Sequence, residues 1–164
     1  MQVALVADTH IPSRAEAIPD GARARMRSAD HVIHAGDFDS SKALADIERL
    51  AESLTAVEGN MDPHSLGLKA VSTVELGGVG FVVTHGTGSR RGYEQRVAGM
   101  VADHDSPGPT VGVSGHTHEP LDTTVDGYRL LNPGSVTGAA PAEEATMMTV
   151  EVTDGGLDVT VHRE

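Results

Sequence analysis

The first half of the chain alternates between short, continuous apolar runs and stretches with helical spacing. The apolar runs Gln2–Ala7, Asp30–Ala35 and Leu54–Val57 predict strands that are buried on both faces. Between them the pattern predicts a helix over Gly21–Ser28 and a second over Lys42–Ser53, capped by Ser40 or Ser41. This β-α-β-α-β order favours parallel strands that are joined by crossover helices.

The second half of the chain predicts antiparallel hairpins instead. Glycine-containing turns separate three pairs of apolar runs, and Asp-Gly and Gly-Gly are strong hairpin signals. The pairs are Val71–Leu76 with Gly80–Thr84, Thr123–Val125 with Tyr128–Leu131, and Met147–Val152 with Leu157–His162. A helix over Arg90–His104 and a strand over Thr110–Ser114 lie between the first two pairs. No linker interrupts the chain, so we expect residues 1–164 to form one α/β domain of two packed mixed β-sheets flanked by helices.

The charge of the chain restricts its partners. Twenty-four Asp and Glu residues oppose 12 Lys and Arg, which gives a net charge of −12. Such a surface repels long nucleic acids and anionic membranes. The chain has no cysteine, secretory signal or apolar span, and we expect a cytoplasmic protein. The acidity fits either an ordinary acidic protein or adaptation to high salt, which the near absence of lysine favours slightly.

Polar residues follow five of the predicted strands directly. They form the segments Asp8-Thr9-His10, Gly36-Asp37, Gly59-Asn60-Met61-Asp62, Thr84-His85-Gly86 and Gly115-His116-Thr117-His118. Ligands of α/β proteins bind beyond the carboxyl ends of the strands, so we expect these segments to meet in one crevice. Any single one of these residues has a plain structural alternative, because aspartates cap helices and histidines at strand ends are often solvated.

In this order, Asp-x-His, Gly-Asp, Gly-Asn, His and Gly-His-x-His resemble the signature of the calcineurin-like metallophosphoesterases. The resemblance runs from Met1 to about Gly138. The short chain and the segment Leu131-Asn132-Pro133-Gly134-Ser135 resemble the smallest branch, the bacterial and archaeal phosphodiesterases. The retromer subunit vacuolar sorting protein 29 is related to this branch in fold. The resemblance implies a sandwich of two mixed sheets and a site for two divalent metals.

The resemblance also implies a role for each polar residue. Asp37 is expected to bridge the two metals, with Asp8, His10 and His118 on the first and Asn60, His85 and His116 on the second. Asp37, Asn60 and His116 are the expected catalytic residues. Two divalent cations clamp a phosphoryl group and lower the pKa of a bound water. Nitrogen and oxygen ligands without sulfur suit Mn²⁺, our first expectation, and leave Ni²⁺, Fe²⁺, Zn²⁺, Co²⁺ and Mg²⁺ open.

One position departs from the larger members of the family, which carry a histidine after the Gly-Asn asparagine. Here that residue is Met61, whose thioether cannot transfer a proton. This change favours diesters or activated esters over monoesters with poor leaving groups. Asp62 or His64 remain alternative acids, and Met61 itself is a candidate contact to the substrate. Among nearby arginines, Arg14 is the first candidate to hold a substrate phosphate.

We therefore expect a phosphodiesterase that acts on a small phosphate ester. The alternatives are a protein-interaction scaffold on the same fold and a phosphomonoesterase. A homo-oligomer is left open.

Overall fold

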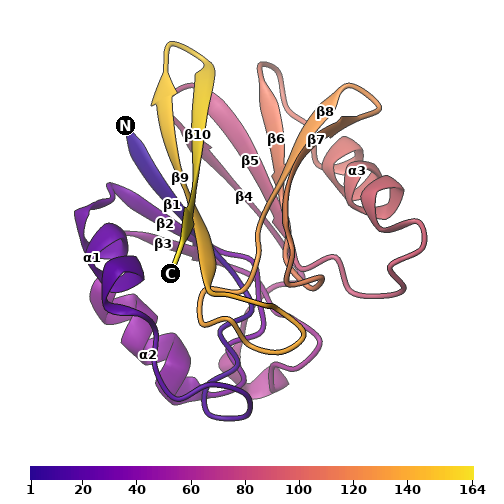
Figure 1. Ribbon diagram of the computed structural model, residues 1–164. Coiled ribbons are helices and arrows are strands. Elements are labelled where there is room, and N and C mark those ends of the chain that lie inside the picture. Colours follow the sequence, from indigo (N-terminus) through magenta and orange to yellow (C-terminus); the bar gives the residue numbers. More distant parts are fainter.

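The computed structural model describes residues 1–164 and contains two five-stranded mixed sheets that pack face to face (Figure 1). In the first sheet the strand order is β10-β9-β1-β2-β3. Strands β1, β2 and β3 run parallel, while β9 is antiparallel to β1 and β10 to β9. The bounds are β1 (Gln2–Val6), β2 (His31–His34), β3 (Leu54–Ala56), β9 (Thr146–Thr153) and β10 (Gly156–Arg163).

The second sheet has the order β4-β5-β6-β8-β7. Its three central strands are parallel, and the hairpins β4–β5 and β7–β8 close its two edges. The bounds are β4 (Val71–Leu76), β5 (Val79–Thr84), β6 (Thr110–Val113), β7 (Pro120–Val125) and β8 (Tyr128–Pro133). The predicted parallel units and all three predicted hairpins are therefore confirmed, and so is the two-sheet α/β fold class.

Helices cover the outer faces of both sheets. Helices α1 (Asp20–Ser28) and α2 (Ser41–Leu50) lie against the first sheet, and α3 (Tyr93–Asp103) lies against the second (Figure 1). A single 3₁₀ turn, η1 (His64–Leu66), follows β3. No helix combines the length and the apolar character that crossing a bilayer requires.

Three apolar layers result from this stacking. Sixteen buried residues fill the space between the two sheets, among them Leu5, Ile33 and Phe81. A second cluster of 13 buried residues lies between the first sheet and α1 and α2, and a third of six lies under α3. Because the central strands are covered on both faces, their sequences are largely apolar, as the pattern predicted.

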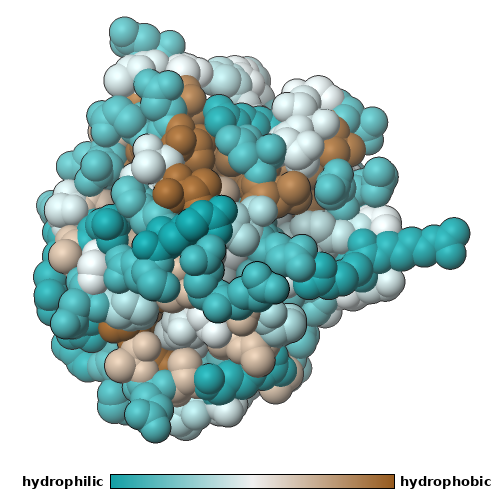
Figure 2. Space-filling model, in the orientation of Figure 1, coloured by the Kyte–Doolittle hydropathy of each residue, from teal (hydrophilic) through white to brown (hydrophobic).

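The edge strand β10 is covered less completely. Its inward-facing residues Leu157 and Val159 pack against the central layer but stay half-buried, and Val161 is 37% exposed. Figure 2 shows brown, hydrophobic surface over the region of β9 and β10 within an otherwise largely hydrophilic face.

Two predicted helices are shorter in the structure. The helix predicted over Lys42–Ser53 ends at Leu50, and its cap is Ser40, whose hydroxyl accepts a hydrogen bond from the Ala43 N–H at 3.1 Å. The helix predicted from Arg90 begins at Tyr93, because Gly92 takes a left-handed conformation with φ of 73°. The 3₁₀ turn at His64–Leu66 was not predicted.

Candidate metal centre

The loops after four parallel strands lie together at one end of the sandwich (Figure 1). They carry five buried polar side chains. Asp8 and His10 follow β1, Asp37 follows β2, His85 follows β5 and His118 follows β6. All five are 5% exposed or less. Because β1 and β2 belong to one sheet and β5 and β6 to the other, the cluster lies where the carboxyl ends of both sheets meet.

The ligand atoms of these residues fall into two overlapping groups. Those of Asp8, His10 and His118 lie within 4.8 Å of one another, and so do those of Asp8, Asp37 and His85. Asp37 Oδ2 lies 3.4 Å from His10 Nε2 and 3.2 Å from His85 Nε2, so one carboxylate oxygen faces both groups. Asp8 Oδ1 lies 3.3 Å from His118 Nε2.

The backbone around the cluster takes an unusual conformation. Eight residues other than glycine have positive φ, and six of them carry or adjoin the candidate ligands: Asp8, His10, Asp37, Asp39, His116 and His118. The left-handed region is unfavourable for residues with a Cβ and persists where the surroundings enforce it. Short loops that turn sharply after each strand therefore aim these side chains inward.

Each buried histidine of the cluster is held through its Nδ1 atom. The Nδ1 atoms of His10, His85 and His118 donate to Asp39 Oδ1 at 2.9 Å, the Ala35 carbonyl at 2.7 Å and the Ala139 carbonyl at 2.8 Å. A neutral imidazole that donates through Nδ1 presents a lone pair at Nε2. Three lone pairs thus point into the cluster, an arrangement that orients histidine ligands in metal sites.

Asn60 and His116 lie at the rim of this cluster. His116 donates through Nε2 to the Gly88 carbonyl at 2.8 Å, and its Nδ1 faces Asn60 Oδ1 at 3.0 Å. The ring centroid of His116 lies 5.2 Å from that of His85. A neutral His116 in this tautomer has no proton on Nδ1, so two acceptors face each other here. A metal ion between them resolves such a contact, and so does a rotation of the Asn60 amide that turns its NH₂ group towards Nδ1.

The same close approach of acceptors occurs in the interior. His10 Nε2 and His118 Nε2 lie 3.2 Å apart, although both rings donate through Nδ1. Asp8 Oδ1 and His85 Nε2 are buried and have no hydrogen-bond partner. Buried polar atoms without partners are rare and indicate a ligand or an ion. The donor set therefore fits divalent cations.

Electrostatics at the cluster agree with this fit. Burial alone would raise the pKa of Asp8, but the neighbouring imidazoles of His10, His118 and His85 hold that pKa well below its usual range. Burial alone would lower the pKa of His85, yet the nearby carboxylates of Asp37 and Asp8 raise it. The site thus keeps its carboxylates ionised and attracts positive charge. With Asp39 and Asp62, four carboxylates lie close together, and their negative charge favours the binding of cations.

Two acidic residues have contacts that the sequence did not reveal. Asp39 accepts the hydrogen bond that orients His10, and Asp62 accepts hydrogen bonds from four backbone N–H groups. Both Asp62 oxygens are therefore occupied, which argues against the proposed role of this residue as an acid. One feature of the sequence could have indicated Asp39: it lies two residues after Asp37, the same spacing as that between Asp8 and His10.

The remaining candidate residues lie outside the cluster. Met61 is 44% exposed, and its backbone N–H donates to Asp37 Oδ1 at 2.8 Å, so its side chain lies beside the site. His64 is exposed and pairs with Glu58. Arg14 is exposed, and its guanidinium donates to the Ala140 carbonyl at 3.0 Å.

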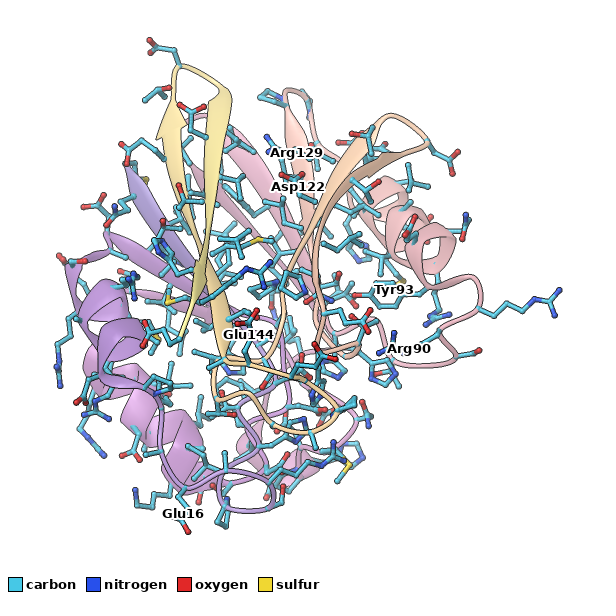
Figure 3. All side chains as sticks on the ribbon, viewed as in Figure 1. Glu16, Arg90, Tyr93, Asp122, Arg129 and Glu144 are labelled. Carbon is cyan, nitrogen blue, oxygen red and sulfur yellow. The ribbon has the colours of Figure 1, made fainter.

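Buried polar groups support the loop that carries His116 and His118. The Asn132 amide donates to the Gly115 carbonyl and to Thr117 Oγ1, and Tyr93 Oη also donates to the Gly115 carbonyl. Arg90, which lies near Tyr93 in Figure 3, donates to the Thr117 carbonyl at 2.8 Å. The segment around Asn132 thus holds the histidine loop in place.

The fold agrees with what comparisons with known proteins show. The model of the calcineurin-like phosphoesterase superfamily domain matches residues 1–155, and the chain belongs to this family. A probable metallophosphoesterase of Methanothermobacter thermautotrophicus is 32% identical, over 99% of this chain and 92% of that protein. A phosphodiesterase of Methanocaldococcus jannaschii is 29% identical, over 84% of this chain and 86% of its own length.

Solved structures show the same fold. Vps29 of Entamoeba histolytica in complex with Zn²⁺ is 25% identical with a TM-score of 0.79, over 100% of this chain and 98% of that one. A Thermotoga maritima protein is 27% identical with a TM-score of 0.75 and covers 99% of both chains.

Proposed function

We propose that this protein is a divalent-metal-dependent phosphodiesterase that hydrolyses a small phosphate ester at a dinuclear centre. The observation that carries the proposal is the pair of ligand groups that share Asp8 and face a single oxygen of Asp37. In each group, buried ligand atoms face one another at distances that suit a bound cation, which supports the proposal. Residues 1–164 act as one unit in this proposal.

The residues divide into two sets. Asp8, His10 and His118 would hold one metal, Asn60, His85 and His116 would hold the other, and Asp37 would be shared between them. When bound, two divalent cations polarise a phosphoryl group and lower the pKa of a water molecule. Mn²⁺ is the proposed metal; imidazole, carboxylate and amide ligands without thiolate are compatible with it and equally with Ni²⁺, Fe²⁺, Zn²⁺ or Co²⁺. Asn60 and His116 lie side by side at the rim of the cluster, and together with Asp37 they are the proposed catalytic residues.

The preference for diesters rests on the absence of a proton donor at the rim. Met61 occupies the position next to Asn60, and its thioether has no proton to give. Both oxygens of Asp62 accept backbone hydrogen bonds, and His64 is exposed and pairs with Glu58. An ester with a stable leaving group needs no acid, so diesters with good leaving groups are the best substrates. Met61 then offers an apolar contact to the leaving group.

Arg14 is the proposed residue that holds a non-reacting phosphate oxygen. Its guanidinium has several N–H donors, and only Nη1 is used, in a hydrogen bond to the Ala140 carbonyl. The other donors can bind a phosphate oxygen. The net charge of −12 favours small esters as substrates, because it repels long polyanions. We propose that the protein acts in the cytoplasm.

Steady-state hydrolysis of nitrophenyl diesters and alkyl phosphate monoesters tests this proposal. Each substrate is assayed with Mn²⁺, Ni²⁺, Mg²⁺ and Zn²⁺ after the protein has been freed of metal. We expect diester turnover that depends on added metal, together with weak monoester turnover. Equal turnover with and without metal, or no turnover with any of the four, contradicts the proposal.

A scaffold function is the second candidate, because Vps29 structures are similar in fold and one of them is in complex with a cyclic peptide. Vps29 of Entamoeba histolytica is also known in complex with Zn²⁺, so metal binding alone does not separate the two functions. Turnover does. A protein that binds two metals but hydrolyses no phosphate ester supports the scaffold.

A further inference from the structure

We propose that Asp62 is a positioning residue of the metal centre: it binds no metal itself but holds the loops that carry the metal ligands. Its Oδ1 accepts hydrogen bonds from the N–H groups of Phe38 at 2.7 Å and Asp39 at 2.9 Å. Its Oδ2 accepts from Asp37 at 2.9 Å and Gly59 at 2.8 Å. One buried carboxylate thus joins the loop after β2 to the loop after β3. This inference rests on the dinuclear centre proposed above.

The two loops hold each other in both directions. Asp37 Oδ1 accepts the N–H of Met61 at 2.8 Å, while Asp62 accepts the N–H of Asp37. Within the second loop, the Asp62 N–H donates to the Gly59 carbonyl at 3.2 Å and Gly59 donates back to the Asp62 carboxylate. A Cβ on Gly59 would collide with the backbone and carboxylate of Asp37, so this close approach requires glycine.

The groups held by Asp62 are those that place metal ligands. Three consecutive N–H groups, at residues 37 to 39, point at one carboxylate, although Asp37 and Asp39 have φ of 64° and 77°. This conformation directs Asp37 Oδ2 towards His10 and His85 and places Asp39 to orient the His10 ring. The fourth N–H belongs to Gly59, the residue before Asn60. Asp62 therefore acts on ligands of both metals.

A carboxylate is needed because two oxygens must each accept two N–H groups. In an Asp62→Asn variant, one oxygen becomes an amide nitrogen whose protons face two N–H donors. In an Asp62→Glu variant, the charge remains but an additional methylene displaces both oxygens. Residues that orient metal ligands typically change metal affinity by about 10–100-fold when they are substituted.

Calorimetric titration of metal-free protein with Mn²⁺, well below its melting temperature, tests this role. We expect Asp62→Asn and Asp62→Glu to bind Mn²⁺ about 10–100-fold more weakly than the parent, while circular dichroism shows a folded protein. Asp103→Asn, an exposed change of the same charge on α3, is the matched control and keeps the parent affinity. Unchanged affinity in folded Asp62→Asn overturns the inference. Unchanged affinity in Asp62→Glu also contradicts it, because the negative charge alone would then be sufficient and the position of the two oxygens would not matter.

Hydrogen exchange of the unaltered protein is the second measurement, and it holds even where the variants fail to fold. The N–H groups of Asp37, Phe38, Asp39 and Gly59 should exchange more slowly than other loop amides, because all four donate to one buried carboxylate. Exchange at the rate of exposed loop amides overturns the inference. A parent that binds no Mn²⁺ instead counts against the proposed function and leaves this exchange pattern as the test of Asp62.

Discussion

His34 makes the stability of this protein depend on pH. Its side chain is fully buried, its Nδ1 accepts the Gly36 N–H at 3.1 Å, and its Nε2 bonds to Thr9 Oγ1 at 2.8 Å. The ring also stacks on Phe38 with centroids 3.6 Å apart. Burial lowers the pKa of His34 from 6.5 to about 3. The unfolded chain therefore takes up a proton below about pH 6.5 that the folded protein does not, and stability falls as the pH drops.

The size of this effect follows from the two pKa values. Between pH 7.5 and pH 5.0, a group that titrates at 6.5 when unfolded and near 3 when folded reduces the free energy of unfolding by about 2 kcal/mol. With a urea m-value of about 2 kcal/mol/M, the midpoint of unfolding moves by about 1 M. His34→Gln removes this contribution, whatever its effect on stability at neutral pH.

Urea unfolding at several pH values measures the difference. The midpoint of the parent should fall more steeply between pH 7.5 and 5.0 than that of His34→Gln, by about 1 M in total. His104→Gln, a change at an exposed histidine, should retain the pH dependence of the parent. Parallel profiles for the parent and His34→Gln would show that His34 has the same pKa in the folded and the unfolded protein, which would refute the reasoning.

Four further expectations concern the site and the surface. Asp37→Ala should abolish turnover with little change in melting temperature, because the site lies at strand ends; global unfolding would make Asp37 structural. Gly59→Ala should weaken Mn²⁺ binding, because its Cβ meets the Asp37 carboxylate, and parent-like affinity contradicts this. Met61→His should raise alkyl monoester turnover, since a well-placed acid contributes about 10²–10⁴-fold; unchanged monoester kinetics show that the residue is not near the leaving group. If the charge of −12 is an adaptation to salt, the melting temperature should rise between 0.1 M and 2 M KCl, whereas a flat response indicates an ordinary acidic protein.

Local signals in the sequence predicted the elements well. The Gly77-Gly78 and Asp126-Gly127 pairs placed two hairpins, and the apolar runs placed the buried strands. Element ends were less predictable, because they depend on single backbone conformations such as the left-handed Gly92. The convergence of the strand ends on one site could also be expected, since parallel strands end at the same edge of a sheet.

The support of the site could not be read from the sequence. Asp62 contacts N–H groups that lie 23 to 25 residues earlier in the chain, and no local pattern shows that a carboxylate will accept them. His116 belongs to the same Gly-His-Thr-His segment as His118. It nevertheless lies at the rim, where its Nε2 donates to the Gly88 carbonyl. Such contacts arise only when loops from different strands meet.

The number of metal ions per chain tests the central claim most directly. Metal-free protein is reconstituted with excess Mn²⁺, passed through a desalting column and analysed for bound metal against protein concentration. The two ligand groups that share Asp8 and face Asp37 predict two Mn²⁺ per chain. One equivalent or less contradicts the dinuclear centre.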